Sequence, residues 1–119
     1  MTRRATLSEI DGKLRALLDE DPARAIEGAR KLLDGDADLR SLAAGVLIDG
    51  GAASADKAAI EDGIGVFREL AEKYPKIPAM RYNLANGLSA LGDLEQFVDV
   101  NWYLSTHIRG AREGLYTLP

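Results

Sequence analysis

The chain has 119 residues, of which 46% are hydrophobic and 29% charged, a composition typical of one folded domain and not of a disordered chain. It contains no cysteine, which excludes disulfide bonds and thiolate metal sites. The formal net charge of −4 gives no electrostatic reason to expect binding to nucleic acid or to an anionic membrane.

Two helices are predicted at the start of the chain. Thr6-Leu-Ser-Glu9 has the spacing of a capping box and starts a helix over residues 6–19. Asp21, which is followed by a proline, predicts the N-cap of a second helix over residues 22–34. Because the connection between them is short, the two helices should form an antiparallel pair.

Three more helices are predicted in the middle of the chain, over residues 37–49, 55–73 and 78–91. Asp36 or Asp38 can cap the first of these, and the pair Gly50-Gly51 should end it. The chain has 12 glycines, which is many for a helical protein. We expect them at turns or at close contacts between helices.

The helical pattern weakens after residue 91. Residues 93–105 include β-branched, aromatic and short polar residues that favour helices less, so a short helix and an ordered insertion remain equally open. A last helix is predicted over residues 107–118, where apolar residues return at helical spacing. If it pairs with the helix over residues 78–91, the array ends without a polar capping helix, which suggests a truncated chain or an end covered by another chain.

A family pattern spans the turn at residues 72–78 and the helices on either side of it. Phe67 and Pro75 stand where one repeat closes, and the run from Tyr82 to Asp93 matches the first helix of the next repeat, with its inter-helix turn at Gly92-Asp93. This pattern resembles the tetratricopeptide repeat family and is clearest over residues 60–97. Three positions depart from the family pattern: Arg81 stands in place of the usual Trp, and Gly63 and Phe97 each stand in place of an Ala.

The resemblance implies an all-α, right-handed solenoid of helical hairpins, with about three repeats in a single domain over residues 1–119 and a degenerate last repeat. In this family the first helix of each repeat lines a concave groove that binds a protein or peptide segment. The positions that would line the groove are Arg40, Ser41, Ala79, Tyr82, Asn83, Asn86 and Ser89. Asn83 offers a donor and an acceptor to a peptide backbone, and Arg40 offers a charge to a partner's carboxylate. The alternative for Asn83 is a hydrogen bond across the helix pair or a side chain that faces water, and the alternative for Arg40 is a solvated surface side chain.

The remaining candidate site residues either fit more than one interpretation or lack the further residues that a metal or catalytic site would need. Trp102 and Tyr103 suit an interface anchor as well as core packing or a lid over the groove. Residues 34–38 begin like a calcium loop, but Leu39 and Gly45 stand where that loop needs Gly and Glu. His107 has no second ligand in metal-binding spacing, and no catalytic triad or isolated carboxylate pair stands out. We therefore expect no enzymatic activity, no metal and no cofactor.

The expected function is that of a non-catalytic scaffold or adaptor that binds a protein or peptide segment. The longest apolar run, residues 42–48, is too short to span a bilayer, so we expect a soluble, cytoplasmic protein with no nucleic-acid or membrane partner. The alternative is the N-terminal regulatory or self-assembling part of a longer protein whose effector domain, for example a nuclease-like one, lies downstream. A homo-oligomer would form through the C-terminal end of the array. Within the fold, Ala85 is expected at a close helix contact, so Ala85→Arg should unfold the domain.

Overall fold

The computed structural model describes residues 2–106, with side chains described through Glu95. This part of the chain is helical and contains five helices: α1 (Arg3–Glu20), α2 (Pro22–Arg30), α3 (Ala37–Ser54), α4 (Lys57–Lys73) and α5 (Pro78–Thr106). The all-α class is thereby confirmed for the described residues. The helix predicted over residues 107–118 lies outside them.

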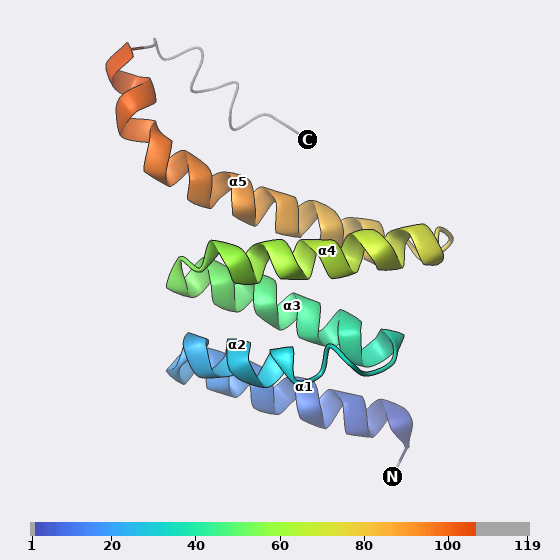
Figure 1. Ribbon diagram of the computed structural model, residues 1–119. Helices are drawn as coiled ribbons and strands as arrows, with labels where there is room; N and C mark the ends of the chain where they lie inside the picture. Colours follow the sequence, from blue (N-terminus) through green and yellow to red (C-terminus); the bar gives the residue numbers. More distant parts are fainter. Residues whose placement is uncertain (1, 107–119) are drawn as a thin grey trace.

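The helices stack in the order of the sequence. Each helix packs on the next one along the chain, and α3 also contacts α1 and α5. In Figure 1, α1 and α2 form the lower part of the molecule, α3 and α4 its middle, and α5 its upper edge. Within the described part of the chain, α3 and α4 therefore have neighbours on two sides, whereas α1 and α5 each have neighbours on one.

Aspartate side chains fix the starts of three helices. Asp21, Asp36 and Asp56 each accept a hydrogen bond from the backbone N–H three residues on, at 3.3, 3.1 and 3.1 Å. The predicted caps at Asp21 and Asp36 are therefore confirmed. The predicted capping box at the first helix is wrong, because α1 starts a turn earlier with Thr2 as its N-cap. The Thr6 hydroxyl instead donates to the Thr2 carbonyl oxygen at 3.1 Å.

The end of α3 differs from the sequence prediction. The helix continues through Gly50-Gly51 to Ser54 and ends at Ala55, whose φ of 56° lies in the left-handed region. The two glycines are buried where other helices come close: a Cβ on Gly50 would lie 2.8 Å from Ile26 Cγ1 of α2, and one on Gly51 would lie 2.7 Å from Ile60 Cγ1 of α4. Glycine at these positions permits close packing and does not end the helix.

Two other boundaries also differ from prediction. Helix α2 ends at Arg30 instead of residue 34. The residues that follow form turns in which a backbone N–H donates to the carbonyl oxygen three residues back, as that of Leu32 does to Ala29 at 2.9 Å. Helix α5 runs through the expected turn at Gly92-Asp93 and covers residues 93–105 as well. Contacts with α4 continue on both sides of Gly92, since Glu95 pairs with Lys57 at 3.7 Å, and they favour an uninterrupted helix.

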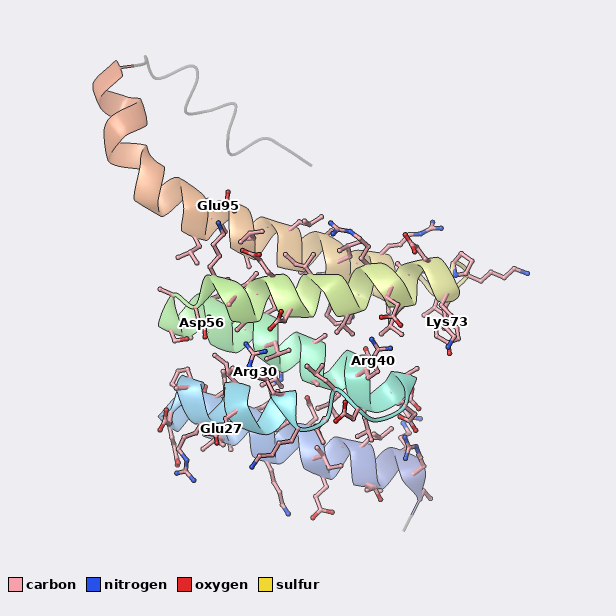
Figure 2. All side chains as sticks on the ribbon, in the orientation of Figure 1. Glu27, Arg30, Arg40, Asp56, Lys73 and Glu95 are labelled. Atoms are coloured by element: carbon pink, nitrogen blue, oxygen red, sulfur yellow. The ribbon has the colours of Figure 1, made fainter. Side chains whose placement is uncertain are left out.

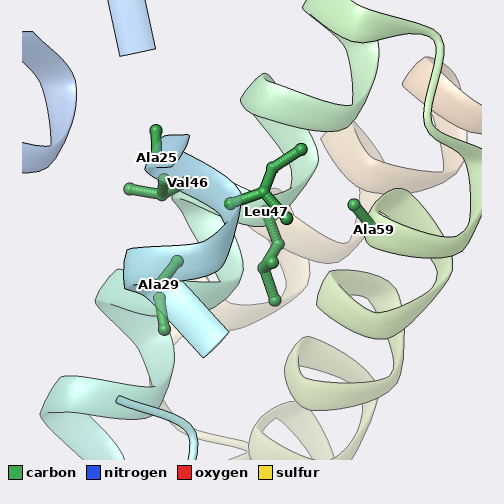
Figure 3. Close-up of a cluster of buried hydrophobic side chains, with 7 residues drawn as sticks. Ala25, Ala29, Val46, Leu47 and Ala59 are labelled. Atoms are coloured by element: carbon green, nitrogen blue, oxygen red, sulfur yellow. The ribbon is translucent and has the colours of Figure 1, made fainter. Parts of the chain in front are cut away.

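The core consists of two clusters on either side of α3. The first lies between α2, α3 and the start of α4, and Figure 3 shows its members Ala25, Ala29, Val46, Leu47 and Ala59. The second joins α3 and α4 and includes Ile48 and Phe67, with Met80, Leu84 and Ala90 of α5 packed against it. Alanines in both clusters have no exposed surface. Because their side chains are small, the helices that carry them can pack close together.

The inward side of α5 centres on Gly87, which is buried against Ile48 and Ile64. Ala85 lies two residues away and is exposed. The sequence-based placement of Ala85 at a close helix contact is therefore wrong. A long side chain at this position can extend into water, so the expected unfolding by Ala85→Arg loses its physical reason.

Candidate functional site

A hollow of about 740 Å³ lies between α1, α3 and the corner that joins α4 to α5. Its volume falls within the range of about 300–1,000 Å³ that is usual for ligand sites. Helix α1 contributes Arg4, Leu7, Ser8 and Asp11, and the α3 side contributes Asp36, Ala37, Asp38, Ser41 and Leu42. Helix α4 contributes Leu70, the corner contributes Tyr74 and Ile77, and α5 contributes Met80. We call this set the α1–α3 hollow.

Backbone hydrogen bonds hold the corner that closes one side of the hollow. The N–H of Tyr74 donates to the Leu70 carbonyl at 2.8 Å, that of Ile77 to Tyr74 at 3.1 Å, and that of Met80 to Ile77 at 3.2 Å. Lys73 Nζ lies 5.7 Å from the centre of the Tyr74 ring, within range of a cation–π contact. These bonds place the Tyr74 ring and the Ile77 side chain on the hollow, although both belong to a connecting segment.

The charged residues that line the hollow, which we call its rim, are more negative than positive. The lining includes the carboxylates of Asp11, Asp36 and Asp38 and a single guanidinium, that of Arg4. Asp36 is already engaged, since it caps α3 and pairs with Arg3. The other two carboxylates lie on the α1 and α3 sides of the hollow.

One predicted groove residue, Ser41, lines the hollow, whereas its neighbour Arg40 is engaged elsewhere. Arg40 of α3 is labelled in Figure 2. Its two terminal nitrogens donate to the carboxylate of Glu69 on α4 at 3.0 and 2.7 Å. This bidentate hydrogen bond lowers the pKa of Glu69. Because the Arg40 side chain is only 23% exposed and paired, its charge serves the α3–α4 contact.

The predicted groove residues of α5 do not line the hollow. Asn83 is half-buried, and the exposed residues are Ala79, Tyr82, Asn86 and Ser89. Tyr82 is 67% exposed and is the most exposed large hydrophobic side chain among the described residues. Trp102 and Tyr103 lie within α5, but their side chains are outside the described part.

Sequence reasoning missed the contributions of α1 and of the α4–α5 corner. Leu7 belongs to the apolar stripe of α1, a helix with no fully buried residue. Ile77 is apolar, 45% exposed and placed in a turn between Lys76 and Pro78. An apolar residue in such a connection is the signal that could have pointed to a binding surface.

Two smaller hollows of about 490 and 370 Å³ are lined mainly by residues of α4 and α5, with Arg68 in both. Leu88 lines the smaller one and is 44% exposed, almost the same as Ile77. The two residues therefore form a matched pair of exposed apolar side chains on different surfaces.

Among the residues whose side chains the structure describes, no group of three or more His, Cys, Asp or Glu is placed to hold a metal ion. None of the helices described is both long and apolar enough to cross a membrane. Comparisons with protein-family models, with curated proteins and with solved structures found no match.

Proposed function

We propose that this protein is a non-catalytic binding module whose α1–α3 hollow receives a segment of another protein. The observation that carries the proposal is the hollow itself, whose lining combines side chains from α1, α3, α4, α5 and the α4–α5 corner; we call its apolar residues the floor. Leu7, Leu42 and Met80 form part of that floor. Apolar anchors that enter such a floor provide most of the binding free energy of protein segments.

The proposal includes a fold of the tetratricopeptide type, with two hairpins, α1–α2 and α3–α4, followed by the single long helix α5. The packing of each helix on the next, together with the contacts of α3 with α1 and α5, supports this arrangement. In that family the first helices of the repeats line the binding groove, and here these would be α1, α3 and α5. The hollow has lining residues from all three.

A protein segment suits the hollow better than a small molecule does. Small-ligand sites orient their ligand with a few polar groups inside an apolar pocket. Among the described residues no polar or charged side chain is buried, and this holds for the polar residues that line the hollow. A chain segment is long enough to fill the floor and reach the rim at the same time.

The proposal is tested by selecting random peptides on the immobilised protein and measuring the affinity of the selected peptides for two variants, Ile77→Asp and Leu88→Asp. Ile77→Asp should weaken binding by at least about tenfold, because a carboxylate on the floor loses hydration when the peptide binds. Leu88→Asp is the matched control and should bind as the wild type does. Circular dichroism should show both variants folded, since both side chains are largely exposed.

Two results would overturn the proposal. One is a selection that enriches no peptide at all. The other is enriched peptides that bind Ile77→Asp and the wild type equally, which would place their site outside the hollow.

A further inference from the structure

We infer that the segment bound by the α1–α3 hollow is basic as well as apolar, and that its Lys or Arg side chains meet Asp11 and Asp38; this rests on the proposed function. Of the three carboxylates of the rim, Asp36 is already paired within the chain. Asp11 and Asp38 retain oxygens that can accept hydrogen bonds from a basic partner.

Asp38 is the least engaged carboxylate of the rim. It lies in the first turn of α3, is exposed, and makes no ion pair with any residue in the described part of the chain. The N-terminus of α3 is already capped by Asp36, so Asp38 is not needed to accept the backbone N–H bond there. Its two oxygens can therefore accept hydrogen bonds from a partner.

Asp11 also retains acceptor capacity. Its nearest cation is Arg15, whose Nε lies 3.5 Å from the Asp11 carboxylate, at the limit of a hydrogen bond. Arg15 also donates from a terminal nitrogen to Asp49 on α3, so its guanidinium is shared between two carboxylates. An additional cation from a partner would complete the hydrogen bonding of Asp11.

The charges that oppose a basic ligand are few. Arg4 is the one cation among the lining residues, and Arg3 is engaged by Asp36. Of the cations next to the lining, Arg15 is shared between Asp11 and Asp49, and Lys73 lies against the Tyr74 ring. Arg4 is exposed on the first turns of α1, and its long side chain can turn toward water. The net charge of −4 over the whole chain adds long-range attraction for a basic segment and repulsion for an acidic one.

The test uses three fluorescein-labelled peptides of about 12 residues, each with Leu at helical spacing. The remaining positions are all Lys in the first peptide, all Gln in the second and all Glu in the third. The wild type should bind the Lys peptide about tenfold more tightly than the Glu peptide at low salt, and added salt should reduce this difference. The double variant Asp11→Asn/Asp38→Asn should lose most of the preference.

The control is the double variant Asp19→Asn/Asp34→Asn. Asp19 and Asp34 are exposed and do not line the hollow, so this variant has the same net charge as the first but leaves the rim intact. It should keep the preference for Lys. If both double variants lose the preference equally, only the overall charge of the protein matters and the inference is wrong.

Other outcomes separate this inference from the proposed function. No binding of the Lys peptide, equal binding of all three peptides, or stronger binding of the Glu peptide overturns the inference. In each of these cases the proposed function is still tested separately, by comparing the affinity of the selected peptides for the wild type and for Ile77→Asp. If the Lys peptide binds wild type and Ile77→Asp equally, both proposals fail, because the peptide is then held outside the hollow.

Discussion

The central hairpin α3–α4 and the outer helices α1 and α5 differ in how their apolar residues are used. Helices α3 and α4 each contain seven buried residues, whereas α1 contains none. Yet α1 has five apolar residues at helical spacing, of which Leu14, Leu17 and Leu18 pack against the first cluster. The difference shows that burial in a stack depends on having neighbours on two sides, so an apolar stripe alone does not make a core helix.

The largest effect expected from this comparison is that of Phe67→Ala. Phe67 is fully enclosed in the second cluster, and its truncation should lower the free energy of unfolding by about 3–5 kcal/mol. Leu14→Ala on the half-buried stripe of α1 should cost only about 1–2 kcal/mol. Urea denaturation of both variants measures the two values. Equal losses would show that α1 is held as tightly as the centre.

A second test uses two glycines of α4. A Cβ on Gly63 would lie 2.7 Å from Ile48 Cγ1 and 2.8 Å from the Ala44 carbonyl oxygen, whereas one on Gly65 would meet nothing within 4 Å. Gly63→Ala should therefore destabilise the protein by about 1–3 kcal/mol through overpacking. Gly65→Ala should stabilise it by about 0.5–1 kcal/mol, because alanine favours the helix. Thermal unfolding should shift in opposite directions, and a shift of the same sign in both would contradict the close contact between α3 and α4.

The link between α3 and α4 offers a stabilising change. Ala55 has a φ of 56° and a ψ of 39°, a conformation that costs an L-residue about 1–2 kcal/mol and costs glycine little. After allowance for the greater freedom of glycine in the unfolded chain, Ala55→Gly should stabilise the protein by about 0.5–1 kcal/mol. A lower midpoint of urea unfolding for this variant would argue against the left-handed end of α3.

The smallest effect is expected on the outer face of α5. Ala85 is exposed, so Ala85→Arg should change the free energy of unfolding by less than about 0.5 kcal/mol. A large loss of stability in this variant would mean that α5 has neighbours on two sides, as α3 and α4 do. Differential scanning calorimetry measures the shift.

The helix starts could be predicted from the sequence where a local signal was sufficient. Asp21 and Asp36 sit one residue before their helices, and the cap is formed with residues only three positions away. The role of Gly50-Gly51 could not be predicted in the same way. Glycine suits both a helix end and a close contact, and the choice depends on Ile26 and Ile60, which approach from other helices.

The candidate site was predicted only in part for a related reason. Ser41 was identified from its place on a first helix, but Leu7 and Ile77 join it from segments far away in the sequence. Arg40 was misjudged because its carboxylate partner, Glu69, lies 29 residues further along the chain. Side chains that meet across helices carry no local signature, so their pairing requires the three-dimensional arrangement.

The stacking of each helix on its neighbour in the chain also has a kinetic consequence. Contacts that join segments close in sequence form quickly, so the domain should refold on a microsecond to millisecond timescale. Opening can begin at α1 while α3 and α4 remain folded, and the amide hydrogens of α1 should then exchange with solvent before those of the centre. Because α1 forms one wall of the α1–α3 hollow, fraying of this helix and release of a bound segment would be the same event.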